Sequence, residues 1–285
     1  MLTLSRRVVS MFVAVAAVAA VAAVALALVA GSGCAGRAVT ISPVPARPLR
    51  AATLEEVLAA HDAYCNGMDT LSASGDLDIR DLRAGKARKL GVRLVATRGG
   101  KLYLKASVAM ITAIEVSSDG QQFWFQVPSR KTVWTGRADA SHRAEDDQAP
   151  YYALRPADVA AALLPEPIAP EPGETLLLEG DREAFTLTVA AASRGPVRRV
   201  VALDRDGLRP LRSRQYDARG DIVSEFVYGE MGHVPAPAHR VAVNRPREGY
   251  EAIFTFDKAD ANVPVSARAF GPRTPAGCTV VEVAP

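Results

Sequence analysis

The sequence predicts a mainly β protein, an antiparallel barrel or sandwich of about 10 or 11 strands with an N-terminal helix and a short central helix. Three observations support this fold class. After residue 67 the apolar residues follow a period of two, and turn signals with glycine or proline separate the alternating stretches. Helical spacing occurs in only two stretches beyond the N-terminal region. Strands repeated at intervals of roughly 10 to 15 residues favour a barrel or sandwich over a parallel α/β sheet.

The first 34 residues have the composition of a lipoprotein export signal. Arg6 and Arg7 precede an apolar run over 8–30, and the small residues 31–33 lead directly to Cys34. We expect Cys34 to be lipidated and to become the first mature residue. Gly31 stands where such signals usually carry an aliphatic residue, and the apolar run is long enough to cross a bilayer uncleaved. An uncleaved anchor and cleavage with release therefore stay open, and all three alternatives place the remaining chain outside the cytoplasm.

The predicted organisation has three parts. Residues 1–33 form the signal peptide, 34–52 a proline-rich tether, and 53–285 a single β domain. The formal net charge is +3, and two of the positive charges lie in the signal, so the mature chain would be nearly neutral. Its arginines are interspersed with acids, as in 204–206. A nucleic-acid partner would call for a basic patch, so we exclude one.

The chain has three cysteines. If Cys34 carries lipid, Cys65 and Cys278 remain as an even number in a compartment where disulfides persist. A disulfide between them would connect the first helix to the C-terminal tail. Two separate thiols are the alternative.

The first folded element is predicted to be a helix that begins after Thr53. Thr53 and Glu56 have the spacing of a capping box, in which each side chain binds the backbone amide of the other residue. Leu54, Val57, Leu58 and His61 follow at helical spacing, and 66–67 is the expected end. His61 lies on the apolar face and is interpreted as a core histidine.

The strands follow as alternating apolar stretches. Gly99-Gly100, Asp119-Gly120, Asp206-Gly207 and Arg219-Gly220 supply turn signals between some of them. The stretches with the clearest pattern are 71–79, 90–94, 101–108, the segment that ends at 119, 122–127, 185–189, 197–203, 222–228, 239–243 and 252–256.

A second helix is predicted in the middle of the chain. Pro156 suits a first helical turn, and Val159, Leu163 and Leu164 follow before Pro165. Such a helix could cover the open end of a curved sheet as a lid. An ordinary connector packed against one face is the alternative.

Sequence signals for catalysis are absent. The four histidines are far apart, and the sequence contains no HExxH, no GxSxG nucleophile elbow and no phosphate-binding loop. We therefore expect no enzymatic activity, no bound metal and no cofactor.

Five segments resemble the LolA/LolB-like superfamily of periplasmic lipoprotein carriers and receptors. These segments are 64–75 (YCNGMDTLSASG), 119–128 (DGQQFWFQVP), 155–159 (RPADV), 216–220 (YDARG) and 262–270 (NVPVSARAF). The resemblance covers nearly all of 53–270. It implies an unclosed β-barrel whose helices line or cover a hydrophobic cavity that receives acyl chains.

The resemblance also implies a function. With a lipid on Cys34, the chain would be a receptor-like protein of the bacterial envelope, with a periplasmic carrier as partner. Ala35 stands where an aspartate is associated with retention in the inner membrane, which favours an anchor in the outer membrane, facing the periplasm, and leaves the inner membrane as the alternative. The nearest counterpart of the receptor's protruding apolar loop is 109–111. The expected cavity lining is Leu102, Leu104, Phe123, Phe125, Leu187, Val201, Phe226 and Phe254 from strands, with Val159 and Leu163 from the lid. The alternative is a structural or regulatory lipoprotein with a solid core that binds other proteins.

Overall fold

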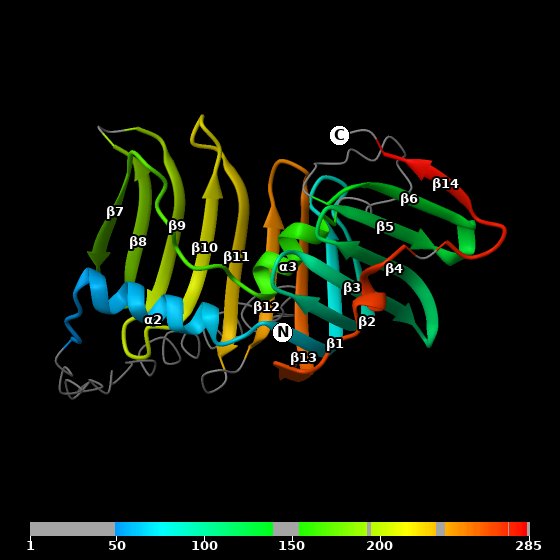
Figure 1. Ribbon diagram of the computed structural model, residues 1–285, viewed down its shortest axis with the longest axis horizontal. Helices are drawn as coiled ribbons and strands as arrows, with labels where there is room; N and C mark the ends of the chain where they lie inside the picture. The colour runs from blue at the N-terminus through cyan, green and yellow to red at the C-terminus, as the bar shows by residue number, and fades with distance from the viewer. Residues whose placement is uncertain (1–48, 139–153, 193–194, 232–236, 273, 284–285) are drawn as a thin grey trace, which may run out of the picture. The chain divides into compact units, whose positions relative to one another are not determined.

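The strands of the described residues form one fourteen-stranded sheet that does not close on itself (Figure 1). The computed structural model describes residues 49–138, 154–192, 195–231, 237–272 and 274–283. The strand order is β14-β6-β5-β4-β3-β2-β1-β13-β12-β11-β10-β9-β8-β7. All the pairings are antiparallel except that of β14 with β6, which is parallel. The predicted fold class is therefore confirmed.

The elements occur in two antiparallel meanders. The first consists of β1 (Thr70–Asp81), β2 (Lys86–Thr97), β3 (Lys101–Val108), β4 (Ile111–Asp119), β5 (Gln122–Val127) and β6 (Thr132–Arg137). The second consists of β7 (Glu174–Gly180), β8 (Ala184–Ala191), β9 (Val197–Asp204), β10 (Pro210–Tyr216), β11 (Ile222–Met231), β12 (Ala238–Arg245) and β13 (Tyr250–Ala261). The other elements are α2 (Leu54–Asn66), α3 (Pro156–Leu163), the short 3₁₀ helices Pro128–Arg130 and Ala267–Phe270, and β14 (Thr279–Glu282).

The two meanders join in the middle of the sheet, where β1 pairs with β13. The register of this pair shifts between Ser74 and Gly75, the position of a β-bulge. A Cβ atom at Gly75 would lie 2.1 Å from the backbone oxygen of Thr255. Glycine is therefore required for the close approach of the two backbones at this junction.

The helix α2 has the predicted capping box. The backbone amide of Glu56 donates to the Thr53 hydroxyl at 3.2 Å, and the amide of Thr53 donates to the Glu56 carboxylate at 2.8 Å. At the other end, Arg98 donates to the backbone oxygens of Cys65 and Met68. The guanidinium thus supplies donors and positive charge where a helix leaves carbonyl groups unpaired.

The helix α3 begins with Pro156 and has no side-chain cap. It packs against β2, β3, β4 and β12, whereas α2 lies over β7 to β11 (Figure 1). Strand register places both helices on the same face of the sheet, because Val201, Ser213, Phe226 and Val243 are aligned across β9 to β12. We call this the inner face.

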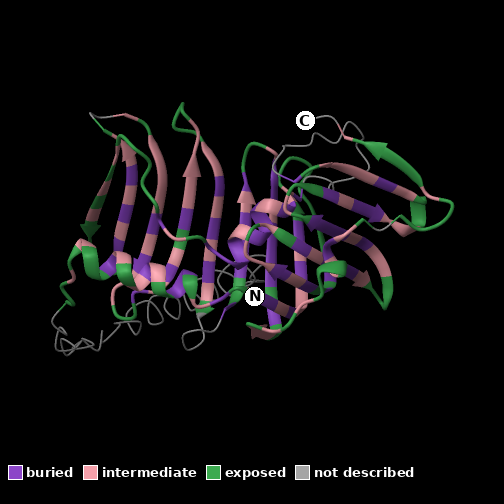
Figure 2. Cartoon of the chain, in the orientation of Figure 1, coloured by how far each residue is buried: buried purple, intermediate pink, exposed green. Residues whose placement is uncertain are grey.

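The core lies between the inner face and the two helices, in two apolar clusters. The first cluster lies under α3 and combines residues of β1 to β5 and β11 to β13 with Val159 and Leu163. The second lies under α2 and combines Val57 with residues of β8 and β9. Figure 2 shows buried residues alternating with more exposed ones along the strands, as expected when one face of a sheet is covered.

No described helix is long and apolar enough to cross a membrane. The apolar run of 8–30 and the predicted lipid attachment site Cys34 lie outside the described residues.

Candidate functional site

The inner face of the sheet is the candidate site, because it gathers all the side chains expected to line a cavity. Each of the ten is at most 4% exposed. Leu102, Leu104, Phe123, Phe125, Phe226, Phe254, Val159 and Leu163 belong to the cluster under α3, whereas Leu187 and Val201 belong to the cluster under α2. These side chains pack against one another, so a ligand between sheet and helices would require the helices to move outward.

A cavity of about 340 Å³ opens beside α3. Its lining comes from the β2–β3 turn, from α3 and from the segment that follows α3, and includes Arg98, Gly100, Ala161 and Leu164. None of the ten expected lining residues is among those that line it. The cavity therefore lies at the edge of α3, on the border between helix and solvent-exposed turn.

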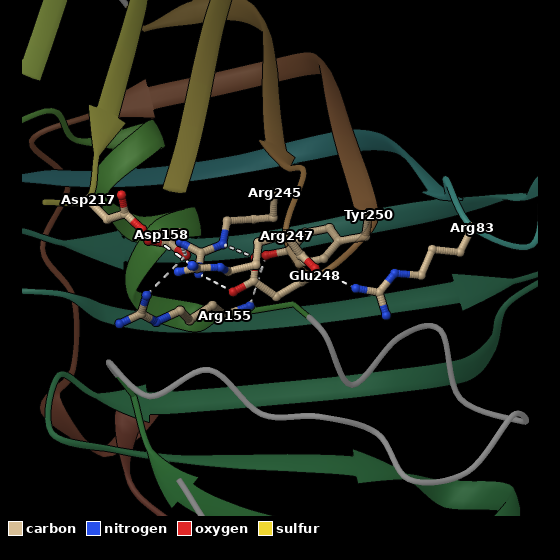
Figure 3. A network of polar contacts seen from close by, with 8 residues as sticks. All are labelled: Arg83, Arg155, Asp158, Asp217, Arg245, Arg247, Glu248 and Tyr250. Carbon is tan, nitrogen blue, oxygen red and sulfur yellow. Dashed lines mark hydrogen bonds and ion pairs between the residues drawn. The ribbon is translucent and has the colours of Figure 1, made fainter. Parts of the chain in front are cut away.

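A buried ion-pair network attaches α3 to the β12–β13 turn (Figure 3). Arg245 is 1% exposed, and its Nη1 lies 2.9 Å from Oδ2 of Asp158 in the first turn of α3. Its Nη2 and Nε contact the Glu248 carboxylate at 2.5 and 3.1 Å. The backbone amide of Arg155 donates to the Tyr250 hydroxyl at 3.3 Å. The N-terminal end of α3 is thus held by charge as well as by apolar packing.

The electrostatics of this network reflect its burial. Burial raises the pKa of Asp158, although Arg245 and Arg155 act in the opposite direction. For Arg245, burial acts to lower the pKa, but the carboxylates of Asp158 and Glu248 outweigh it and hold the pKa above its usual value. Breaking such a pair leaves an uncompensated buried charge, which costs more than the pair itself contributes.

The underside of α2 carries polar groups. His61 is 1% exposed, and its ring nitrogens lie 3.6 and 3.7 Å from Sγ of Cys65. Burial, with the positive charge of Arg199, lowers the pKa of His61 to about 4, and burial raises that of Cys65 to about 12. Both side chains are therefore uncharged at neutral pH. The interpretation of His61 as a core histidine is confirmed.

The β3–β4 turn exposes an apolar tip, which we define as residues 108–111. Met110 is 98% exposed, Ile111 75% and Val108 53%. Ala109 and Met110 have φ values of 45° and 70°, the positive values of a tight two-residue hairpin turn that normally carries glycine or asparagine. The exposed stretch expected at 109–111 therefore exists, in a strained backbone.

The two cysteines of the described residues do not form a disulfide with each other. Cys65 is buried and Cys278 half-buried, and both are free thiols in the structure. Within the described ranges, no group of three or more His, Cys, Asp or Glu side chains is arranged to hold a metal ion.

Comparison with known proteins gives likenesses of structure only. No family model matches the chain, and no curated protein matches it. Among solved structures, it is similar to a LolA superfamily protein from Nitrosomonas europaea (12% identity, 78% of this chain and 99% of that one, TM-score 0.48). It is also similar to a putative outer membrane lipoprotein-sorting protein domain from Vibrio parahaemolyticus (14%, 76% and 93%, 0.45).

A third similar structure is a DUF1329 family protein from Desulfovibrio piger (16% identity, 75% of this chain and 97% of that one, TM-score 0.46). At these sequence identities, structural similarity carries no conclusion about function.

Proposed function

We propose that the protein binds acyl chains of lipids or lipoproteins between the inner face of its sheet and the helices α2 and α3. The observation that carries this proposal is the apolar surface that α3 covers. Val159 and Leu163 are nearly fully buried against β strands, yet the helix is only eight residues long. If α3 moved outward, a ligand could take its place on the same side chains, and each acyl CH₂ group removed from water would contribute roughly 0.8 kcal/mol.

The exposed tip supports an accessory role at a membrane. Met110 and Ile111 place apolar side chains in solvent at the end of a hairpin, and the strained turn keeps them there. We propose that this tip contacts the membrane from which acyl chains come or to which they go. Residues of this kind at a protruding loop mark interaction sites more often than a scattered single leucine does.

We propose further that the protein acts in the bacterial envelope, anchored through a lipid on Cys34, in lipoprotein localisation to the outer membrane, with no catalytic step. The support is the sequence signal over 1–34 and the resemblance of the motifs to LolA/LolB-like proteins. Mass spectrometry of the protein extracted from membranes tests the anchor. An acylated N-terminus at Cys34 is expected, and an intact or unmodified N-terminus would contradict it.

A variant pair tests the binding site. Leu104→Trp adds bulk on the inner face, whereas Tyr103→Trp adds it on the opposite face of the same strand. Lipids extracted from the purified full-length protein are measured by mass spectrometry, after circular dichroism shows both variants folded. We expect acyl lipid with the wild type and with Tyr103→Trp and much less with Leu104→Trp. Equal lipid in both variants would contradict the proposal.

A second function is favoured by the tight packing of the interior. A regulatory or structural protein with a solid core would bind other proteins through its surface, the exposed tip included. It predicts a wild-type protein free of lipid and a protein partner cross-linked at the tip in intact cells. Lipid in the wild type that Leu104→Trp removes would contradict it.

A further inference from the structure

The inner face of β11 carries hydroxyl groups that are buried without a partner. Tyr228 is 5% exposed and Ser224 is fully buried. Among the residues that the structure describes, neither hydroxyl oxygen has a hydrogen-bond partner. An unpaired buried hydroxyl is unfavourable, and phenylalanine and alanine would fill the same positions without that penalty. Two unpaired buried hydroxyl groups on one strand call for an explanation, and a ligand that pairs with them would supply it.

Tyr228 belongs to a group of polar side chains at the inner face, which we call the polar cluster. The cluster consists of Tyr228, Arg199 on β9, and His61 and Cys65 on the underside of α2. Arg199 lies near this part of β11, because its Nε is 3.4 Å from the hydroxyl of Ser213, which pairs with Phe226, two residues before Tyr228 on the same face of β11. Its positive charge also favours a lower pKa for each of the other three side chains. Around the cluster, the carboxylates of Asp62 and Glu166 lie on the more exposed side and act on Cys65 as well.

The cluster offers more donors than acceptors. Nε of Arg199 lies 3.4 Å from the Ser213 hydroxyl, and its Nη2 donates to the backbone oxygen of Glu166 at 3.3 Å. A guanidinium has five N–H groups and no acceptor. Together with the Tyr228 hydroxyl, which also donates, the cluster is suited to an oxygen that accepts several hydrogen bonds.

We infer that Tyr228 and Arg199 form a polar anchor for the carbonyl oxygen of an acyl group, so that the inner face takes acyl chains in preference to plain hydrocarbon. This inference rests on the proposed function and adds the part of the ligand that is recognised. The acyl chain lies on the apolar side chains, and the carbonyl oxygen of an ester, amide or carboxylate accepts from the Tyr228 hydroxyl and from the guanidinium. No covalent step is involved.

Binding of three radiolabelled probes to the delipidated full-length chain tests the anchor. Palmitic acid and methyl palmitate carry the carbonyl oxygen, and hexadecane has the same chain length without it. Tyr228→Phe should weaken both carbonyl probes about fivefold, the fold-change for the net contribution of one hydrogen bond, and leave hexadecane unchanged. Tyr103→Phe is the matched control, because it removes a hydroxyl on the opposite face of β3, and should change none of the three.

The same variant should behave differently without ligand. Since Tyr228→Phe removes an unpaired buried hydroxyl, the thermal midpoint of the ligand-free protein should rise by roughly 2–4 °C. Ser224→Ala tests the second hydroxyl in the same two ways. A loss of affinity with a gain of stability supports a ligand-pairing role, whereas a fall in both would show that the hydroxyl acts only in the fold and would overturn the anchor.

The outcomes separate this inference from the proposed function. If the wild type binds all three probes and Tyr228→Phe binds them equally well, acyl binding stands and the anchor is wrong. If the wild type binds none of them, the proposed function fails, and the anchor fails with it. An effect limited to palmitic acid assigns the anchor to a free carboxylate, and an effect on both carbonyl probes assigns it to any acyl carbonyl.

Discussion

The two helices that cover the inner face are held in different ways. The helix α2 begins with a capping box, ends on Arg98 and lies over the sheet through Val57 and its neighbours. The helix α3 has no side-chain cap and is attached by a buried ion pair between Asp158 and Arg245. Local chain chemistry therefore defines the start of α2, whereas a contact from a distant part of the sequence positions the start of α3. The two helices should therefore respond to different perturbations.

Asp158→Ala is expected to have the largest effect. It leaves Arg245 buried with one carboxylate fewer, and the free energy of unfolding should fall by about 3 kcal/mol. The control is Glu251→Ala, which breaks a surface pair with Arg80, whose side chain is 51% exposed, and should cost less than about 1 kcal/mol. Urea unfolding of the full-length chain measures both. Similar losses in the two variants would show that burial of the ion pair is not what holds α3.

Acid should act on the α2 side through His61. The unfolded chain binds a proton near pH 6.5, whereas the buried imidazole does so only near pH 4. Stability from this group is therefore complete above pH 6.5 and is lost as the pH falls towards 4, by about 3 kcal/mol in all. His61→Gln cannot take the proton, so its stability relative to the wild type should improve across this range. An unchanged difference between pH 7 and pH 4.5 would contradict the assignment.

The exposed tip can be relieved of backbone strain. Replacing Ala109 and Met110 by Asn and Gly suits the positive φ values of the turn and should stabilise the chain by about 1 kcal/mol. The same double substitution removes the most exposed apolar side chain, so binding to phospholipid vesicles should fall. Thermal unfolding and vesicle flotation measure the two effects. A stabilised variant that still binds vesicles would show that the tip does not contact membranes.

Thr53→Ala should have the smallest effect. Loss of the capping box costs about 1 kcal/mol and affects the start of α2 alone. Hydrogen exchange should therefore increase at the first turn of α2 and stay unchanged in α3. Faster exchange in both helices would show that α2 and α3 open together, and the conclusion that they are held independently would be wrong.

The sequence predicted the elements whose signals are local. The capping box at Thr53, the first helical turn at Pro156 and the turn at Asp119-Gly120 all lie where they were expected. Periodicity also identified the side chains of the inner face, because residues two apart on a strand share a face. The fold class followed from these patterns and from their spacing.

Other strands gave weaker signals. The strands β6, β7, β10 and β14 were not predicted, and their residues explain why. Three of the seven residues of β10 are Arg212, Arg214 and Gln215, and β14 is exposed along its whole length. In edge strands and polar strands, apolar and polar residues alternate only weakly. The reason is that these strands are only partly buried, so burial selects for apolar residues at few of their positions.

The polar contacts of the site could not be predicted. Asp158 and Arg245 lie far apart in the sequence, and each reads as an ordinary charged residue until the register of β12 and the position of α3 are known. The same applies to Arg199 and Tyr228. Strand order decides which of these residues meet, and no local pattern in the sequence specifies strand order.

The pairing of β1 with β13 has a consequence for how the chain acquires its structure. Each meander can form from neighbouring hairpins. The β1–β13 pairing, which we call the central seam, cannot form until residues near 250 have been synthesised. Contacts between such distant segments are typical of slow folding. Until the seam closes, β1 and β13 each present an unpaired edge, and these edges are the surfaces at which newly made chains would associate wrongly. A permuted chain with β1 placed directly after β13 would turn the seam into a hairpin and should fold faster.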